Sequence, residues 1–342
     1  MGLSEIIGEM NKKLKGDIAH LGVTQYDYER IPFTSPNMNY MTFGGLPKGK
    51  MIEFYGAEHG GKTTSALDIV ANFQHSDDGR KVVYADLENT LDYVWATKLG
   101  VDVDNMVVIS PTNQGAETLF EYFLQMIDTG EVGLVVIDSL GVMVSNQTLE
   151  KSVEEKTYGG IAMALTNFSK KAEMLCAKNN CTLIGINQMR DNLNSTYGGA
   201  ITTGGRAWRH NVAVRIEFRQ GSYFDEKRAD LTRGATNPVG NFVLASLTKS
   251  KTCPPTRRVA QYTLTYAGGI DYLFDLVDVA TKYGWIDKSG SWYTIVDPDT
   301  GEVFAKSLQG MSKVYEFLSG DENKAVLQAI EEYIDQKVKS ND

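Results

Sequence analysis

The chain has 342 residues, of which 42% are hydrophobic, and its formal net charge at pH 7 is −9. This composition excludes an intrinsically disordered chain and favours a globular protein with one large core and a small appendage. No segment approaches the roughly 18 consecutive apolar residues of a membrane span, and the first residues lack the apolar core of a secretory signal. We therefore expect a cytoplasmic protein without a membrane partner.

Cysteine usage and charge distribution limit the partners further. Cys176, Cys181 and Cys253 are an odd number without zinc-type pairing, so reduced thiols are expected. The acidic balance alone argues against a polyanionic partner. Basic residues are nevertheless gathered near residues 12–15, 170–171, 206–209 and 249–258. They are compatible with nucleic-acid binding, although ordinary solvated side chains explain most of them equally well.

In chain order, the first expected element is an amphipathic helix in residues 1–23, where apolar residues recur at helical spacing. A loop rich in Pro, Asn and Tyr follows. Short apolar runs then alternate with helical segments, which is typical of a parallel α/β sheet. The predicted strands are residues 51–55, 81–86, 106–110, 134–138, 182–187, 212–219, 241–249 and 261–266. The predicted helices are residues 62–75, 115–128 and 160–178.

The pattern changes after Gly268-Gly269. A helix is expected over residues 272–283, a hairpin over 285–304, and two helices over 312–318 and 322–339. These elements indicate a small C-terminal α/β domain. The sequence thus predicts an N-terminal helix and linker (1–33), a large α/β core (34–269) and a C-terminal domain (270–342).

Residues 56–63 fit the phosphate-binding pattern G-x-x-x-x-G-K-[ST], directly after a predicted strand and before a predicted helix. In such a loop the glycines turn backbone N–H groups toward phosphates, Lys62 reaches the β and γ oxygens, and the Thr63 hydroxyl binds Mg²⁺. The predicted ATP-binding residues of this loop are Gly56, Ala57, Glu58, His59, Gly60, Gly61, Lys62, Thr63 and Thr64.

Two carboxylates are candidates for the chemistry beside this loop. Asp138 ends the apolar strand L-V-V-I-D, where it would lie beside Thr63 and hold hydrated Mg²⁺. The pattern is weak alone, because many apolar strands end in Asp. Glu88 follows the strand that ends at Asp86, at the edge where the phosphate loop also lies, and is the candidate base for water activation. A solvated loop carboxylate explains Glu88 equally well.

Five motifs together resemble the RecA recombinases in order and spacing, over about residues 40 to 285. They are the segments 45–64 (ending G-A-E-H-G-G-K-T-T), 85–105 (beginning A-D-L-E-N-T-L-D-Y-V-W), 135–139 (V-V-I-D-S), 183–190 (L-I-G-I-N-Q-M-R) and 202–207 (T-T-G-G-R-A). Such a chain of motifs is far more specific than a phosphate-binding loop alone. The resemblance implies a RecA-type P-loop ATPase core with a mostly parallel twisted sheet, and an N-terminal helix that packs on the neighbouring protomer.

The resemblance also implies roles for individual residues. Glu88 would activate water, while Asp92 and Trp95 would flank the adenine ring. Gln188 would detect the γ-phosphate and relay its presence to the second DNA-binding loop. Lys249 and Lys251 would reach the ATP of the neighbouring subunit and neutralise transition-state charge. Without the family pattern, Gln188 is as well explained as a strand-end amide, and the two lysines as an edge-strand pair that deters aggregation.

Two loops, at about 146–160 and 191–205, match the DNA-binding loops of this family. The second is rich in Gly and Thr with single bulky residues, which suits sequence-independent grip on single-stranded DNA through backbone amides and base stacking. A disordered surface loop would have a similar composition. The predicted DNA-binding residues are Lys171, Arg190, Leu193, Tyr197, Gly198, Gly199, Ile201, Gly204, Gly205, Arg206 and Arg209.

Several residues depart from the family pattern and favour a divergent member, of the phage type similar to UvsX. Gly159 stands where a methionine is usual in the first loop, Ala164 replaces a nearby arginine, and His210 replaces a phenylalanine. The second loop is one residue shorter than usual. These departures put the first-loop DNA contacts in doubt.

The resulting hypothesis is an ATP- and Mg²⁺-dependent recombinase that forms helical filaments on single-stranded DNA, pairs it with double-stranded DNA and exchanges strands. Single-strand-binding and loader proteins are expected partners. A ring-forming RecA-fold helicase or motor is one alternative, which the paired lysines disfavour because ring motors more often use an arginine finger. A recombination mediator that does not hydrolyse ATP is the other.

Overall fold

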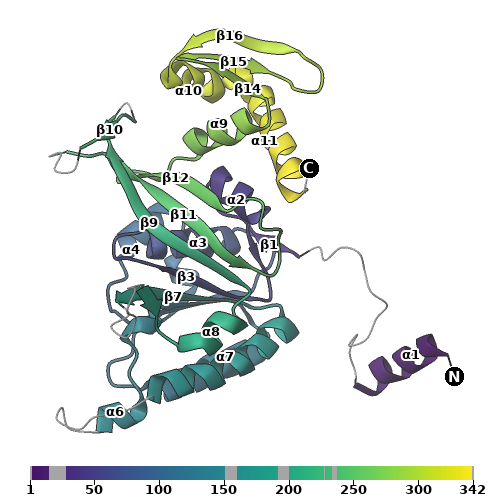
Figure 1. Ribbon diagram of the computed structural model, residues 1–342, viewed down its shortest axis with the longest axis vertical. Helices are drawn as coiled ribbons and strands as arrows, with labels where there is room; N and C mark the ends of the chain where they lie inside the picture. Colours follow the sequence, from purple (N-terminus) through teal and green to yellow (C-terminus); the bar gives the residue numbers. More distant parts are fainter. Residues whose placement is uncertain are drawn as a thin grey trace.

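The structure is a computed structural model that describes residues 2–14, 28–150, 160–191, 200–226, 228–232 and 237–340. A large α/β body carries most of these residues, and a smaller domain formed by the end of the chain lies beside it (Figure 1). Every strand predicted for the core is present, and the mostly parallel α/β class is confirmed.

One 11-stranded sheet forms the body, in the order β13-β12-β11-β9-β3-β7-β6-β4-β5 with β10 and β8 attached at β9 and β7. Pairing is parallel from β9 to β5 and antiparallel from β9 to β13. The parallel strands are β3 (Met51–Gly56), β4 (Lys81–Asp86), β5 (Met106–Ile109), β6 (Val132–Asp138), β7 (Thr182–Asp191) and β9 (Val214–Phe224). The remaining strands are β8 (Ala200–Thr202), β10 (Asp230–Leu231), β11 (Gly240–Ser250), β12 (Val259–Thr265) and β13 (Gly269–Ile270).

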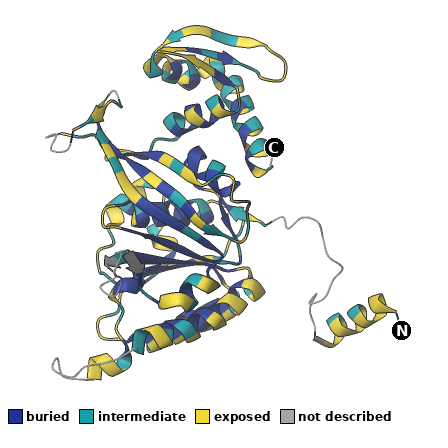
Figure 2. Ribbon diagram, viewed as in Figure 1, coloured by how far each residue is buried: buried dark blue, intermediate teal, exposed yellow. Residues whose placement is uncertain are grey.

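The central strands are buried on both faces, as Figure 2 shows, because their side chains alternate between two hydrophobic clusters. Tyr84 and Val136 lie in the cluster that α3 covers, whereas Val83 and Val135 lie in the cluster covered by α5 and α7. The helices and short turns of the body are α2 (Pro36–Thr42), α3 (Lys62–Gln74), α4 (Tyr93–Lys98), η1 (Val103–Asn105), α5 (Ala116–Asp128), η2 (Leu140–Val142), α6 (Asn146–Glu150), α7 (Gly160–Asn179) and α8 (Gly205–Asn211). A separate two-stranded sheet pairs β1 (Arg30–Ile31) with β2 (Leu46–Pro47).

The C-terminal domain has a hydrophobic core of its own, which includes Trp285, Ile295 and Ile330. Its elements are α9 (Tyr272–Lys282), β14 (Ile286–Ser289), β15 (Trp292–Val296), β16 (Val303–Gln309), α10 (Met311–Ser319), η3 (Asp321–Asn323) and α11 (Lys324–Lys339). The hairpin predicted over 285–304 is present as β14 and β15, and β16 adds a third strand that continues to Gln309. The residues of β16 are exposed or half-buried, so this strand lacks the hydrophobic alternation from which a strand is predicted.

Two arginines of the body bind the C-terminal domain, one at the residue before α9 and the other at the end of α11. Arg228 forms an ion pair of 2.5 Å with Asp271, which also accepts a hydrogen bond from Tyr315 of α10. Arg257 donates to the carbonyl oxygens of Val338 (2.8 Å) and Ser340 (3.1 Å) at the end of α11. A cationic side chain at that position also complements the negative end of the helix dipole.

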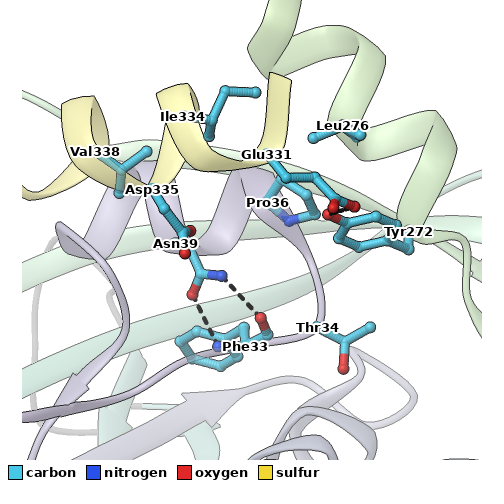
Figure 3. A pocket seen from close by; sticks show the side chains of 10 residues that line it. All are labelled: Phe33, Thr34, Pro36, Asn39, Tyr272, Leu276, Glu331, Ile334, Asp335 and Val338. Carbon is cyan, nitrogen blue, oxygen red and sulfur yellow. Dashed lines mark hydrogen bonds between the residues drawn. The ribbon is translucent and has the colours of Figure 1, made fainter. Parts of the chain in front are cut away.

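A cavity of about 240 Å³ lies where α2, α9 and α11 meet (Figure 3). The Tyr272 hydroxyl donates to Glu331 at 2.7 Å on one side of it. On the other side, the Asn39 amide bonds with the backbone N–H and carbonyl of Phe33, each at 2.8 Å. The two bonds between Asn39 and Phe33 fix the segment that leads into α2.

The predicted N-terminal helix is described only as α1 (Leu3–Leu14), since residues 15–27 lie outside the described part of the chain. Its apolar side chains Leu3, Ile6 and Met10 are exposed. Within the described ranges, no helix has the length and apolar character needed to span a membrane.

Candidate nucleotide and DNA sites

The phosphate-binding loop joins β3 to α3 in the conformation that its glycines permit. Gly56 has a φ of 149°, and a Cβ there would lie 2.0 Å from the carbonyl oxygen of Phe218 on β9. His59 and Gly61 also have positive φ, at 58° and 91°. The sequence therefore needs glycine at Gly56 and Gly61 so that the loop can turn against the neighbouring strand and start the helix.

Lys62 points back into this loop. Its Nζ donates to the carbonyl oxygens of Ala57 (2.6 Å) and Gly56 (3.2 Å). Burial lowers the pKa of Lys62, against the attraction of Asp138, Glu88 and Glu58. A buried ammonium whose partners are neutral carbonyls suits an anionic ligand, because phosphate oxygens would be stronger acceptors than carbonyl oxygens.

Asp138 lies beside Thr63, as predicted. The Thr63 hydroxyl donates to Asp138 Oδ2 at 2.8 Å, and the hydroxyl of Tyr84 donates to the same oxygen at 2.9 Å. Burial raises the pKa of Asp138, with smaller contributions from Glu88 and Asp86, while the two hydroxyl bonds lower it. Among the described residues no three His, Cys, Asp or Glu side chains group as a metal site. The hydroxyl and carboxylate oxygens here fit Mg²⁺, which proteins usually hold by one or two such ligands together with phosphates.

Glu88 is held at the carboxyl ends of β4, β6 and β7. Its Oε1 accepts two hydrogen bonds, from Ser139 Oγ at 2.5 Å and from Gln188 Nε2 at 3.0 Å. The strands are in register here, since Gly56 pairs with Gln188 and Asp86 with Asp138. The predicted water-activating and γ-phosphate residues are therefore in direct contact, and Glu88 Oε2 makes neither of these bonds.

Trp95 lies on α4, close to the start of α3, and Asp92 is the residue directly before α4. Asp92 caps α4 by accepting from the Trp95 backbone N–H at 3.0 Å. The Trp95 indole N–H reaches Thr64 Oγ1 at 3.4 Å. The structure thus brings Trp95 to Thr64 of the phosphate-binding loop, whereas Asp92 is bound to the backbone of Trp95.

A cavity of about 550 Å³ borders the phosphate-binding loop. It is lined by residues 59–64 and by side chains that the sequence did not single out: Gln220, Tyr223, Asn241, Leu264 and Tyr266. The Tyr266 hydroxyl donates to Asn241 Oδ1 at 3.1 Å, which fixes one ring at the cavity wall. Strand-end tyrosines carry no motif, so only the pairing of β9, β11 and β12 reveals this wall.

Lys249 lies near the end of β11, Lys251 follows its last residue, and both contact the end of α8. Lys249 Nζ donates to the carbonyl oxygens of Arg209 (2.6 Å) and His210 (2.8 Å), and Lys251 Nζ lies 3.5 Å from that of Asn211. Burial lowers the pKa of Lys249 to about 8, assisted by repulsion from Lys251. These contacts are to the helix that follows the second predicted DNA loop.

The DNA-binding candidates are only partly described. Leu193, Tyr197, Gly198 and Gly199 lie outside the described residues, as do the side chains of Arg190 and Ile201. Gly204 and Gly205 start α8, where Arg206 is exposed and Arg209 bonds its own helix. Lys171 is exposed on α7, 3.9 Å from Glu121. The first predicted loop begins as the short helix α6, and residues 151–159 lie outside the description.

Comparison with known proteins agrees with this geometry. The family description "RecA N-terminal domain" matches residues 2–271, and "RecA C-terminal domain" matches residues 274–339. Protein RecA of Frankia alni is 33% identical over 304 residues, which are 88% of this chain and 84% of the relative. Protein RecA of Clostridioides difficile is 32% identical over 320 residues, 92% of this chain and 86% of the relative. These matches favour the recombinase over a ring motor or a non-hydrolysing mediator. The chain belongs to the RecA family, and it is a DNA recombinase with DNA-dependent ATPase activity that uses ATP with Mg²⁺.

Proposed function

We propose that residues 56–64 bind the triphosphate, with Asp92 and Trp95 on the adenine side, and that Thr63 and Asp138 hold Mg²⁺. When bound, Mg²⁺ neutralises charge on the phosphate oxygens. The observation that carries the proposal is the convergence of Lys62, the Thr63–Asp138 pair and Glu88 at the carboxyl ends of adjacent strands. Ligands of open α/β sheets bind at this edge.

Glu88 is the proposed base for the attacking water. Ser139 and Gln188 both donate to Oε1, so the proton is accepted at Oε2. Gln188 is the proposed γ-phosphate sensor. Because it stands on β7 directly before the second DNA loop, a change of its hydrogen-bond partner is transmitted to that loop.

Lys249 and Lys251 are proposed to act on the ATP of the neighbouring protomer. In the single chain their ammonium groups bind the last carbonyls of α8. Reaching a neighbour's triphosphate would release these carbonyls, and α8 with the DNA loop before it could then move. ATP at the protomer junction would in this way favour the DNA-binding form of the filament.

The remaining parts of the chain complete the proposal. Residues 1–33 serve polymerisation, 34–269 form the ATPase core and 270–342 the C-terminal domain. Single-stranded DNA is bound by the second loop and by Arg206, Arg209 and Lys171. Single-strand-binding and loader proteins assist in the cytoplasm, and the departures from the family pattern point to a phage-type relative.

A pair of variants tests the nucleotide site. Lys62→Ala should abolish the increase in DNA affinity caused by ATP, because it removes the cation proposed to bind the phosphates. The melting temperature of the protein should not change. Glu88→Gln should lower phosphate release by about 10² to 10⁴-fold and keep nucleotide binding, as expected for loss of a general base. Normal ATP stimulation in the first variant would refute the phosphate assignment, and unchanged phosphate release in the second would refute the base.

A further inference from the structure

Tyr84 is a buried tyrosine whose ring belongs to the core and whose hydroxyl reaches the nucleotide edge of the sheet. It lies in the middle of β4, only 1% exposed, within the cluster between the sheet and α3. Tyr84 pairs with Val136, and Asp86 pairs with Asp138 two residues further along the same two strands. Its ring therefore runs along the sheet face toward Asp138.

The hydroxyl of Tyr84 and the hydroxyl of Thr63 donate to the same oxygen atom of Asp138. Tyr84 OH donates to Asp138 Oδ2 at 2.9 Å, and Thr63 Oγ1 donates to the same oxygen at 2.8 Å. A hydroxyl has one proton, and a carboxylate oxygen has two acceptor positions. The two hydroxyls therefore fill Oδ2, while Thr63 keeps both lone pairs, and Asp138 keeps Oδ1, for other partners.

We propose that Tyr84 is a positioning residue for the Mg²⁺ site, acting through Asp138. The rigid ring fixes the carboxylate so that the single proton of Thr63 is directed to Oδ2 and the lone pairs of Thr63 face the nucleotide. Without the tyrosine hydroxyl, the carboxylate can rotate, and the Thr63 hydroxyl loses its fixed direction. This inference rests on the proposed roles of Thr63 and Asp138.

Removing one oxygen atom tests the inference. Tyr84→Phe keeps the ring that packs in the core. The affinity of the full chain for a fluorescent ADP analogue is measured in EDTA and over a Mg²⁺ titration, and the readout is the ratio of the two dissociation constants. We expect the Mg²⁺-dependent gain in affinity to fall about tenfold, as for loss of a hydrogen bond to a charged group. The dissociation constant in EDTA should be unchanged, and the affinity should recover at high Mg²⁺ concentration.

Tyr262→Phe is the matched control. Tyr262 is equally buried, at 1%, and its hydroxyl lies 2.9 Å from Ser65 Oγ on α3 and 3.5 Å from the carbonyl oxygen of Gly61, without contact to Asp138. It should lose stability but keep the wild-type ratio. A second measurement places Tyr84→Phe in an Asp138→Asn background, where the effect on the ratio should disappear.

The outcomes separate the inference from the function on which it rests. A wild-type ratio in Tyr84→Phe, or an equal loss of affinity with and without Mg²⁺, would show that Tyr84 is only structural. An undiminished effect in the Asp138→Asn background would show that it does not act through Asp138. If the wild-type protein itself gains no affinity from Mg²⁺, the proposed metal site fails, and the role of Tyr84 fails with it.

Discussion

Gln188 Nε2 donates a 3.0 Å hydrogen bond to Glu88 Oε1, so the proposed γ-phosphate sensor is bound to the proposed base. The Nε2 group carries two N–H donors, and a Gln188 side chain that turns toward a phosphate would redirect at least one of them. Glu88 is then still held by Ser139 at 2.5 Å. The contact gives Gln188 one partner on Glu88, and the proposed sensing of the γ-phosphate would give it a second.

The first prediction is that Gln188→Ala uncouples the nucleotide from DNA binding. Because Ser139 still holds Glu88, hydrolysis in the absence of DNA should stay near its wild-type rate. The increase in single-strand affinity caused by a slowly hydrolysed ATP analogue should be lost, since no side chain reports the γ-phosphate to the loop. Fluorescence anisotropy with a labelled oligonucleotide measures this ratio.

Gln74→Ala is the matched control for that experiment. Gln74 bonds the backbone of Asp102 at the far end of α3, so its removal should leave the stimulation by the analogue intact. If Gln188→Ala also keeps the stimulation, Gln188 is an ordinary strand-end amide.

The second prediction concerns the pH dependence of assembly. The pKa of Lys249 is lowered by burial from 10.5 to about 8, so the single protomer carries a neutral amine above that pH. Facing a triphosphate requires the ammonium, and a proton must therefore be taken up on assembly. Nucleotide-dependent filament formation should weaken by up to about tenfold per pH unit as the pH rises above this pKa.

Lys249→Arg decides whether Lys249 is the group that titrates. A guanidinium stays charged throughout this range, so the alkaline decline in assembly should vanish even if assembly is weaker overall. Light scattering from pH 7 to 10 would follow both proteins. An identical decline in the arginine variant would assign the pH dependence to another group.

Much of the site was predictable because its residues belong to motifs or end strands. The loop 56–63 has a spacing that only phosphate binding explains well. Glu88 follows an apolar strand and Gln188 lies near the end of another, and the carboxyl ends of these strands meet at one edge. The bond between Tyr84 and Asp138 was not predictable, because a tyrosine within an apolar strand is normally a core residue. Its partner is set by the register of β4 against β6, which no local pattern encodes.

The third prediction concerns Tyr197, which the sequence places in the second DNA loop and which lies outside the described residues. If its ring stacks on a base, Tyr197→Ala should weaken single-strand binding by about 1 to 3 kcal/mol. Tyr122→Ala, an exposed tyrosine on α5, should leave binding unchanged. Equal affinity of the Tyr197 variant and wild-type protein in oligonucleotide titrations would remove Tyr197 from the DNA site.

The fourth prediction concerns the attachment of the C-terminal domain through Arg257. Its guanidinium lies 4.5 Å from the ring centre of Tyr40 and 4.2 Å from that of Phe43, while it bonds the last carbonyls of α11. Arg257→Ala removes the charged donors and the cation–π contacts together. We expect the free energy of unfolding to fall by about 2 kcal/mol in denaturant titrations.

Arg258→Ala separates this attachment from a general effect of charge. Arg258 is exposed, and among the contacts described its side chain bonds only the carbonyl of nearby Pro255, so the loss of this side chain should change stability by less than about 0.5 kcal/mol. Protease cleavage between the body and the C-terminal domain should accelerate in the Arg257 variant alone, because freeing the end of α11 exposes the connection. Equal stability of the two variants would show that the domain is held by its apolar contacts with α2, and that Arg257 contributes nothing beyond its charge.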